Sequence, residues 1–520
     1  MFGGVIRDPI YGYIDYVKGV EDKVIDSWPL QRLRYIYQLQ TAHFIYPGAT
    51  HTRFNHSIGV MFSSYKYVNY LARTMSAPNL PSEFTKEVST KFKEILLGAR
   101  LLGLLHDVGH GPLSHAFDRY VYRGTKILPY RVGNHEVMGF VIYKHYLRDL
   151  IKTALEKSPY SFDSEYVLWV LDNGMKPPPG MYEFTDLVSK GILEKSDFYE
   201  PKRGQFIENV VRMVVRDYVY TSDIMDYLKR DSYFTGIPIG EINDEWIMRN
   251  SYIVETDGRL LIGVAEKALD EVGRLFDARK IMYKSVYLHP VNLAFIDTMG
   301  RLLDCIKTSL AEAIEAYLNN PAESVAYISL TDHFIYSTLH RLYVKGLEGV
   351  ECEDRDFAQR ALRTLFINRK PVWKMIKRFS TDLRIASHLF SPRFGEDLRR
   401  RMVEEINEEA AKKLGPKIVE GDINVIAEKI DIYPSAGAEI VDYLTVVEAR
   451  DGALVSVTKK KLDDFAREYG LIPEALFTVY VSRDKYAGLD QSDLKKLIEI
   501  SEEVIRDAIK GQGKEAPETS

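Results

Sequence analysis

The chain has 520 residues, a length that predicts a large core domain and at least one smaller unit rather than one compact domain. Apolar residues make up 46% and charged residues 28%, which excludes a largely disordered chain. The formal net charge of −5 disfavours a protein whose whole surface binds nucleic acid. A small anionic substrate fits this charge better, and nucleic acid is not expected as the main partner.

Further features of the sequence bear on the cellular compartment in which the protein is expected. Residues 95–105 form the most apolar stretch of a predicted helix, but Arg100 interrupts it and it falls short of the roughly 20 apolar residues that a membrane span needs. Residues 1–8 lack the start of a signal peptide. We therefore expect a cytoplasmic protein without a membrane partner. Its two cysteines, Cys305 and Cys352, are expected to be reduced, so any metal would be held by nitrogen and oxygen ligands.

The predicted elements from about residue 22 to residue 414 are mainly helical, because apolar residues recur there at spacings of three and four. After residue 415 the pattern changes to β-prone runs, two of them around the turn signal Asp451-Gly452, with helices between and after them. The predicted helices are residues 86–105, 209–220, 261–282, 291–317, 398–414, 460–469 and 492–510. The predicted strands after residue 415 are residues 443–448, 454–458 and 476–481.

These elements predict a mainly α fold with small β elements and a C-terminal α+β appendage. The domains expected are residues 1–415, a main helical domain, residues 416–510, a small α+β domain, and residues 511–520, a disordered tail.

The densest chemical signal is the segment HDVGHGPLSH, residues 106–115, which holds three of the 12 histidines. It ends an apolar helix, where His106 and Asp107 can converge on one ion and His110 lies one turn further on the same side. Imidazole and carboxylate together suit a divalent cation that activates water. An isolated His-Asp pair is more often a helix cap or a buried hydrogen bond, but three histidines and the flanking glycines favour a metal site.

Two weaker groups flank this segment: HTRFNHS at residues 51–57 and SDIMDYLKRD at residues 222–231. Taken alone, the second group would be a solvated helix face. The order along the chain is more informative, because a histidine beside an arginine is followed by His-Asp and then by a distant aspartate.

That order, together with three other segments, resembles the HD-domain phosphohydrolases of the deoxynucleoside triphosphate (dNTP) triphosphohydrolase branch. The segments are DPIYG at residues 8–12, QRLRYIYQL at residues 31–39 and PGAT at residues 47–50. The resemblance covers most of residues 4–400 and implies an HD-domain helical core in the first domain.

The resemblance assigns residues to two adjoining centres. The metal ligands that it implies are His56, His106, Asp107 and Asp223, with His51 only a structural neighbour. The residues that it places around the reacting phosphate are His110, His115, Asp118 and His135. Asp118 follows His115 by three residues and can orient it as the general acid, while the other two histidines stabilise phosphoryl charge. An ordinary surface histidine is the alternative for His135.

Further positions match the branch's substrate pocket. Arg53 and Arg279 suit polyphosphate, because a guanidinium fork binds phosphate oxygens. Leu288 stands where animal members have a glutamine near the sugar, so the sugar preference is left open. The implied substrate-binding residues are Gln38, Leu39, Arg53, Tyr227, Asp231, Arg279 and Tyr287.

The implied reaction is attack of water on a nucleotide phosphorus, releasing a deoxynucleoside and triphosphate. One divalent transition metal is expected, with iron, manganese, zinc and nickel all open, and magnesium can accompany the polyphosphate. Asp26, Gln31 and Arg34 match residues that bind a regulatory guanine nucleotide between subunits, so a homo-oligomer, a dimer or a tetramer, is expected. The alternative is a helix-capping role for Asp26 and solvated positions for the other two.

Two other functions stay open at this stage. The same site could act on another phosphoester, such as a nucleoside monophosphate, a cyclic nucleotide or single-stranded nucleic acid. Residues 459–461, KKK, together with the C-terminal appendage, weakly favour a nucleotide-sensing or nucleic-acid-binding regulator.

Overall fold

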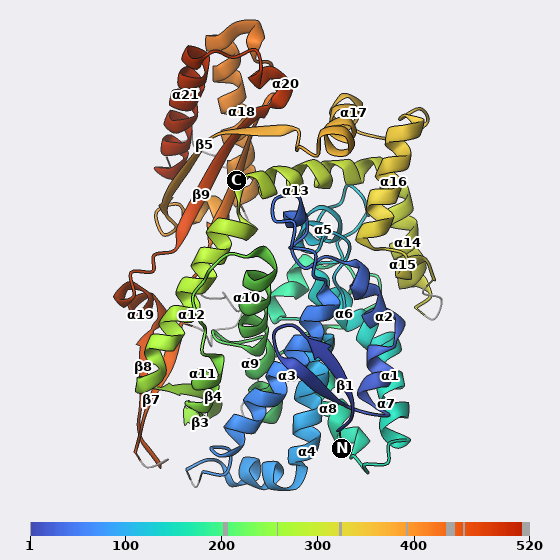
Figure 1. The fold of residues 1–520 in the computed structure, drawn as a ribbon, viewed down its shortest axis with the longest axis vertical. Helices are drawn as coiled ribbons and strands as arrows, with labels where there is room; N and C mark the ends of the chain where they lie inside the picture. The colour runs from blue at the N-terminus through green and yellow to red at the C-terminus, as the bar shows by residue number, and fades with distance from the viewer. Residues whose placement is uncertain are drawn as a thin grey trace, which may run out of the picture.

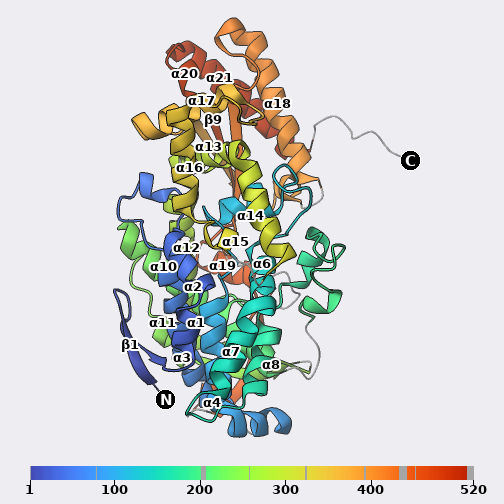
Figure 2. The same cartoon turned by 90° about the vertical axis from the view of Figure 1, so that its right-hand side faces the viewer.

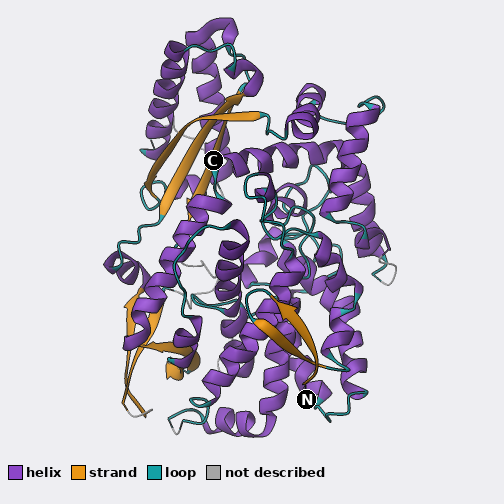
Figure 3. Ribbon diagram, viewed as in Figure 1, coloured by secondary structure: helices purple, strands orange, loops and turns teal. Residues whose placement is uncertain are grey.

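The computed structural model describes residues 2–77, 79–200, 206–256, 258–321, 325–391, 394–432, 442–450 and 453–511. Helices predominate over strands, which form three small sheets (Figure 3). The fold is mainly α with an α+β C-terminal part, as the sequence predicts. In Figure 1 the molecule is elongated, with the C-terminal helices α18, α20 and α21 and the strands β5 and β9 at one end and the N-terminal helices towards the other.

The centre of the helical part is the pair α3 (Arg53–Ala72) and α4 (Ser82–Leu105). Every residue of α4 from Glu94 to Leu105 is buried, because the apolar residues there surround the helix. Helix α10 (Ser222–Thr235) packs on α3 at Gly59, where a Cβ atom would lie 2.0 Å from a carboxylate oxygen of Asp226. Only glycine therefore allows this approach.

Helices α8 to α11 contact this pair. In the rotated view of Figure 2, α1, α2 and α7 lie in the same half of the molecule as α3 and α4, whereas α13, α16 and α17 lie nearer the end that carries α18 and α21. Before α10 the remaining helices of the main part are α1 (Glu21–Ile25), α2 (Trp28–Arg32), α5 (His115–Phe117), α6 (His135–Ile142), α7 (Arg148–Glu156), α8 (Ser164–Gly174) and α9 (Ile207–Val215). After α10 they are α11 (Asp244–Arg249), α12 (Leu269–Met282), α13 (Pro290–Leu302), α14 (Lys307–Asn319), α15 (Val325–Ile328), α16 (Asp332–Lys345) and α17 (Arg355–Arg363).

The three sheets differ in where their strands come from. An N-terminal antiparallel hairpin pairs β1 (Phe2–Asp8) with β2 (Gly12–Val17). A four-stranded sheet has the order β3 (Ser251–Thr256), β4 (Arg259–Ala265), β7 (Tyr443–Arg450) and β8 (Ala453–Lys461), with β4 and β7 parallel. A three-stranded antiparallel sheet has the order β5 (Trp373–Asp382), β9 (Glu474–Ser482) and β6 (Ile423–Ile430).

Helices α18 (Gly395–Leu414) and α21 (Gln491–Ile509) pack on the three-stranded sheet and share with it a second hydrophobic core, which runs in sequence from Ala386 to Ile505. The short helices α19 (Leu462–Glu468) and α20 (Arg483–Tyr486) complete this part. Two sheets thus combine strands from both sides of residue 415, and the expected division at that residue stays a prediction. The expected turn at Asp451-Gly452 and residues 512–520 of the expected tail lie outside the described residues.

Three of the predicted helices were wrong in part. The segment 261–282 begins inside β4, because hydrogen bonds from β3 and β7 select a strand for a run whose apolar residues fit either form. The segment 291–317 is broken by a 3₁₀ turn, Leu303–Ile306, between α13 and α14. The segment 209–220 is helical only to Val215.

The expectation of reduced cysteines was also wrong, since Cys305 and Cys352 form a disulfide. They are 47 residues apart in sequence, and the fold brings their Cα atoms to 4.5 Å. The spacing alone gives no sign of this pairing, because it depends on how the 3₁₀ turn after α13 meets the loop before α17. Among the described helices, none is both long enough and apolar enough to cross a membrane.

Glu208 in α9 makes the stability of the core depend on pH. Its side chain is buried, and neither carboxylate oxygen has a hydrogen-bond partner within the described parts of the chain. Burial raises the pKa of Glu208 from 4.5 to about 7, so the native state keeps this proton where the unfolded chain has lost it. Stability should therefore fall as the pH rises from about 4.5 to 7, and the loss should persist above pH 7.

We predict that Glu208→Gln raises the melting temperature at pH 8 and has a smaller effect at pH 5. Thermal unfolding at both pH values measures this difference. A substitution that lowers the melting temperature equally at both pH values would show that the carboxyl group carries no such penalty.

Candidate metal centre and catalytic site

Helix α3 places the first expected ligand, His56, one turn from its start. Thr52 and Asn55 form a capping box that fixes the beginning of the helix. The ring of His56 is buried, with Nδ1 2.8 Å from an oxygen of Asp226 and Nε2 3.0 Å from Oδ1 of Asp223. The two ring nitrogens therefore have separate partners on α10: Nδ1 contacts Asp226, and Nε2 faces the expected ligand Asp223.

His106 and Asp107 come from the end of α4. Nδ1 of His106 lies 2.8 Å from the carbonyl oxygen of Gly103, whereas its buried Nε2 has no hydrogen-bond partner in the part of the chain that the structure describes. That Nε2 lies 3.4 Å from Asp107 and 3.6 Å from Asp223. Asp107 is also 3.7 Å from Nε2 of His56.

The structure thus brings together all four expected metal ligands, from three helices and more than 160 residues of sequence. Nitrogens of His56 and His106 and an oxygen of Asp223 lie within 4.8 Å of one another in a largely buried place, and Asp107 adjoins both histidines. The unpartnered Nε2 of His106 is an atom that an ion would satisfy. This donor set fits a divalent transition metal. It does not distinguish iron, manganese, zinc and nickel.

A network of charged residues, formed by Asp226, Arg230 and Asp8, orients His56. Asp226 accepts two hydrogen bonds from the guanidinium group of Arg230, which also binds Asp8 at 2.8 Å. Burial tends to raise the pKa of Asp226, but Arg230 and His56 hold it below its usual value. The ionised Asp226 therefore accepts the proton of Nδ1 and turns Nε2 towards Asp223. Burial tends to lower the pKa of His56, but Asp223 and Asp226 raise it to about 10, so a metal bound at Nε2 would displace a proton. Arg230 is fully buried in this network rather than turned towards a substrate.

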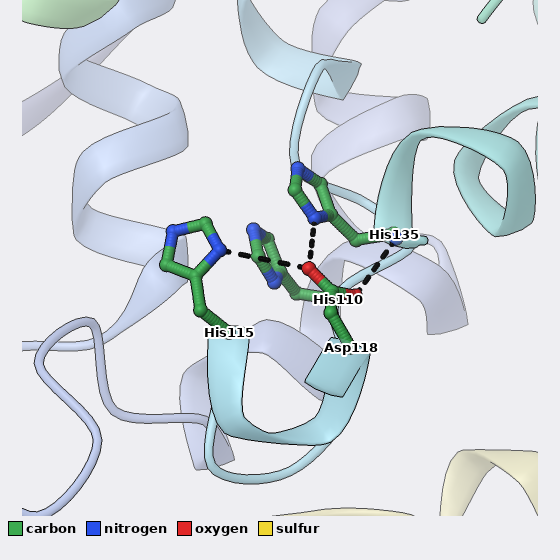
Figure 4. Close-up of side chains that lie close together, drawn as sticks. All are labelled: His110, His115, Asp118 and His135. Atoms are coloured by element: carbon green, nitrogen blue, oxygen red, sulfur yellow. Dashed lines mark hydrogen bonds and ion pairs between the residues drawn. The ribbon is translucent and has the colours of Figure 1, made fainter. Parts of the chain in front are cut away.

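The second centre is the histidine cluster, which we define as His110, His115, Asp118 and His135 (Figure 4). One oxygen of Asp118 lies 2.6 Å from Nδ1 of His135 and 3.5 Å from Nδ1 of His115, so Asp118 serves both rings but binds His135 more closely. Its other oxygen accepts from the backbone N–H of His135. Burial tends to raise the pKa of Asp118, but the neighbouring His135 holds it well below its usual value.

The buried ring of His110 and the partly buried ring of His135 have opposite tendencies. Burial, Arg53 and His135 lower the pKa of His110 well below the ordinary histidine value. Burial also tends to lower the pKa of His135, but the Asp118 carboxylate raises it overall. These shifts favour the neutral form of His110 and the positively charged form of His135. The two rings stack with centroids 3.7 Å apart, so their nitrogen lone pairs lie in nearly parallel planes and cannot converge on one ion.

The HD loop, residues 106–115, joins the two centres. Nε2 of His110 lies 3.5 Å from Oδ1 of Asp107, so the metal centre and the histidine cluster share a border. A Cβ atom on Gly109 would lie 2.0 Å from the backbone oxygen of His135, which explains why the motif needs glycine where α6 approaches. The side chain of His115 is 61% exposed, whereas those of its neighbours His110 and Asp118 are buried.

Of the residues expected to bind the substrate, Arg53 contacts the HD loop, and several others are paired in the structure. Arg53 donates from Nε to Ser114 and binds Asp107 with Nη1. Asp231 accepts from the hydroxyl of Tyr287 at 2.7 Å and lies 2.7 Å from Nε2 of His51, which is therefore a structural neighbour. Gln38 and Leu39 are buried.

Arg279 lies at the contact with the C-terminal part. It donates to the hydroxyl groups of Tyr227 and Tyr283 and to the backbone oxygen of Asp431, just after β6. Arg119, next to Asp118, binds Glu428 of β6 at 2.9 Å. The C-terminal part therefore contacts the short helical segment Asp118–Tyr122 and also Arg279, which is expected to bind the polyphosphate. The sequence did not predict these contacts.

The three expected regulatory residues lie around α2. Asp26 is exposed and follows α1, and no capping bond joins its side chain to α2. Gln31 donates to the backbone oxygen of Ile25 and accepts from Nε of Arg34 at 2.8 Å. The guanidinium of Arg34 lies 3.6 Å from the centre of the Phe54 ring. Gln31 and Arg34 therefore act as a contacting pair, beside the helix that carries His56.

The sequence did not identify several residues that hold the metal ligands and the HD loop in position. Asp226 could have been found from its place one turn after Asp223 on the same helix, with Arg230 four residues further. Arg32 and Asp332 gave no such signal, because their partners are distant in sequence. Arg32 donates to the backbone oxygens of Val108 and His110 from a fully buried position.

This fold and site define an HD domain: the family model of the HD domain matches residues 53–210, which include His56, the HD loop and the histidine cluster. The chain therefore contains an HD domain, and over more than half of its length it is similar to the dNTP triphosphohydrolase branch.

Three curated relatives show the extent of this similarity. The uncharacterized protein MJ1154 of Methanocaldococcus jannaschii is 31% identical over 57% of this chain and 48% of its own length. The deoxynucleoside triphosphate triphosphohydrolase SAMHD1 of Bos taurus is 28% identical over 57% of this chain and 46% of its own length. The SAMHD1 of Homo sapiens is 27% identical over 65% of this chain and 50% of its own length. The chain thus spans about half the length of these relatives.

Proposed function

We propose that this chain is a metal-dependent phosphohydrolase that converts a dNTP into a deoxynucleoside and triphosphate. The observation that carries the proposal is the shared border of the two centres, where His110 lies 3.5 Å from Asp107. Donors for an ion and groups that handle protons and phosphoryl charge thus meet at one place. The similarity to SAMHD1 proteins, whose name gives this activity, supports the choice of substrate.

His56, His106, Asp107 and Asp223 would hold the metal. When bound, a divalent ion there would raise the acidity of a water molecule and stabilise negative charge on a phosphoryl oxygen. The protein's part is to aim these four side chains at one point. The Asp226–Arg230 network does this for His56, because it holds the ring with Nε2 facing Asp223.

The histidine cluster would act on the phosphoryl group and the leaving oxygen. The positive charge expected on His135 suits stabilisation of the oxygens that gain charge in the transition state. His115 is the exposed member, and Asp118 lies on its Nδ1 side, so Nε2 is free to give a proton to the departing 5′-oxygen. No covalent enzyme intermediate is required.

The test is a panel of substrates incubated with metal-loaded protein: dNTPs, ribonucleotides, deoxynucleoside monophosphates, cyclic nucleotides and single-stranded DNA. We expect dNTPs to give deoxynucleoside and triphosphate. Preferred cleavage of a monophosphate, a cyclic nucleotide or DNA would establish the same site as a different phosphohydrolase. Nucleotide binding without any cleavage would instead favour a nucleotide-sensing regulator.

We further propose that a guanine nucleotide activates a homo-oligomer through Asp26, Gln31 and Arg34. A carboxylate can accept from the N1 and N2 donors of guanine, while an amide and a guanidinium complete the contacts. A nucleotide that binds the assembled form more tightly must favour assembly. Gly4 replaces a lysine of regulated family members, and Arg7 stands where an asparagine is usual, so the phosphate contacts would differ.

We predict that dGTP or GTP increases both the molar mass in light scattering and the rate of dATP hydrolysis. Asp26→Ala should reduce both effects without changing the metal content, whereas Asp149→Ala, at another exposed aspartate, should not. A monomer that is fully active without guanine nucleotide would contradict this part of the proposal.

A further inference from the structure

The end of the HD loop has an unusual backbone. Leu113 and Ser114 have φ angles of +60° and +51°, in the left-handed region that residues other than glycine rarely adopt. Both are fully buried, and they come directly before His115. Two such residues in succession need support from their surroundings, because each would relax to another conformation if left free.

The support comes from Asp332, the first residue of α16, which lies more than 200 residues away in sequence. Its side chain is fully buried, with one carboxylate oxygen accepting from the backbone N–H of Leu113 at 2.5 Å. The other oxygen accepts from the backbone N–H of Tyr37 at 2.7 Å. The hydroxyl of Ser114 in turn donates to the backbone oxygen of Tyr37 at 2.8 Å. These bonds close a ring around the strained turn.

The ring also reaches the metal centre. Tyr37 pairs as an isolated β-bridge with Thr52, which caps the helix that carries His56. The hydroxyl of Ser114 accepts from Nε of Arg53 at 3.0 Å, and Arg53 binds Asp107. One buried carboxylate is therefore connected to the turn before His115 and, through Tyr37, to the start of α3.

The same segment is attached to the HD loop a second time. Arg32 donates to the backbone oxygen of Leu330 at 3.0 Å and to that of His110 at 2.6 Å. The position of Asp332 relative to the loop is thus fixed by two independent anchors, so the carboxylate meets its N–H donors in a defined geometry.

We propose that Asp332 is a positioning residue that holds the Leu113–Ser114 turn and thereby aims His115 at the leaving group. This inference rests on the proposed function for its catalytic part. Among the described residues, the hydrogen bonds of the Asp332 carboxylate go to the backbone of Tyr37 and Leu113, not to a metal ligand or an expected substrate group. It acts only through the backbone that it binds.

The first test measures the turn itself and needs no substrate. Asparagine has one acceptor oxygen in place of two, and its amide N–H₂ would face one of the N–H donors. We expect hydrogen exchange in the peptide that contains Leu113 to be about 10-fold or more faster in Asp332→Asn than in the wild type. Thr331→Ala, which removes the cap of the same helix, is the matched control and should leave this peptide protected.

The second test measures turnover. Asp332→Asn should keep its metal and a KM within about threefold of the wild type, while kcat falls about 10- to 100-fold, the scale for a displaced catalytic group. Thr331→Ala should lower the melting temperature and leave kcat unchanged. Ser114→Ala should also reduce kcat, and the double variant should lose less than the product of the two single effects, since both side chains hold one turn.

Unchanged exchange and unchanged kcat in Asp332→Asn would overturn the proposal. Equal losses of kcat in Asp332→Asn and Thr331→Ala would overturn it too, because the carboxylate would then only stabilise α16. If the wild type hydrolyses no dNTP, the proposed function is wrong, and the exchange comparison still decides whether Asp332 holds the turn.

Discussion

Asp107→Ala and His56→Ala are each expected to remove the bound metal and to reduce turnover by at least about 10³-fold, because both water activation and charge stabilisation would be lost. His56 belongs to the group of three donors that lie within 4.8 Å of one another, and Asp107 adjoins that group; an open metal site has no spare ligand. The helical fold should remain, since neither side chain belongs to the hydrophobic core. Metal analysis of the purified variants measures the first effect, and dNTP hydrolysis measures the second.

Asp149→Ala serves as the control for loss of an aspartate, because Asp149 is exposed in the first turn of α7. It should keep both metal and activity. A variant of Asp107 or His56 that retained full metal and normal turnover would show that the residue is not a ligand.

His115→Ala is expected to bind substrate and metal but to turn over about 10²- to 10⁴-fold more slowly, the range for loss of a general acid. Asp118→Asn should show a smaller loss of the same kind, because Asp118 lies 3.5 Å from His115 and acts through it. Steady-state kinetics separate kcat from KM in both variants. Since Asp118 binds His135 more closely, at 2.6 Å, part of its effect should come from a weakened charge on His135.

His340→Ala is the matched control, because His340 is an exposed histidine whose ring contacts Tyr343 and Phe366. It should have wild-type turnover. If His115→Ala also kept a normal kcat, the acid would have to be His110 or His135.

The sequence predicted the long elements well where one periodicity dominated. Helices α4 and α21 and strand β9 lie within a few residues of the predicted segments, because their apolar patterns fit one kind of element only. The segment 261–282 failed at its start for the opposite reason. Its first residues, Leu261 to Val264, are apolar without a preferred period, and the neighbouring strands decided their conformation.

The sequence predicted those site residues whose side chains, histidine and aspartate, have a recognisable chemical role. His106 and Asp107 are adjacent in sequence, so their convergence follows from local geometry, and the ordered resemblance supplied His56 and Asp223. The supporting residues could not be predicted in this way. Asp332 and Arg32 act on backbone groups, and backbone groups leave no trace in the residue types of their partners. The disulfide between Cys305 and Cys352 was hidden for a similar reason.

The most direct measurement of the central claim is hydrolysis of a dNTP by the metal-loaded protein in ¹⁸O-labelled water, with the products separated and weighed by mass spectrometry. Attack of water on the phosphorus next to the sugar, with His115 protonating the 5′-oxygen, predicts one ¹⁸O atom in the released triphosphate and none in the deoxynucleoside. Label in a monophosphate, in pyrophosphate or in orthophosphate as the first product, or in the deoxynucleoside itself, would contradict the proposed reaction.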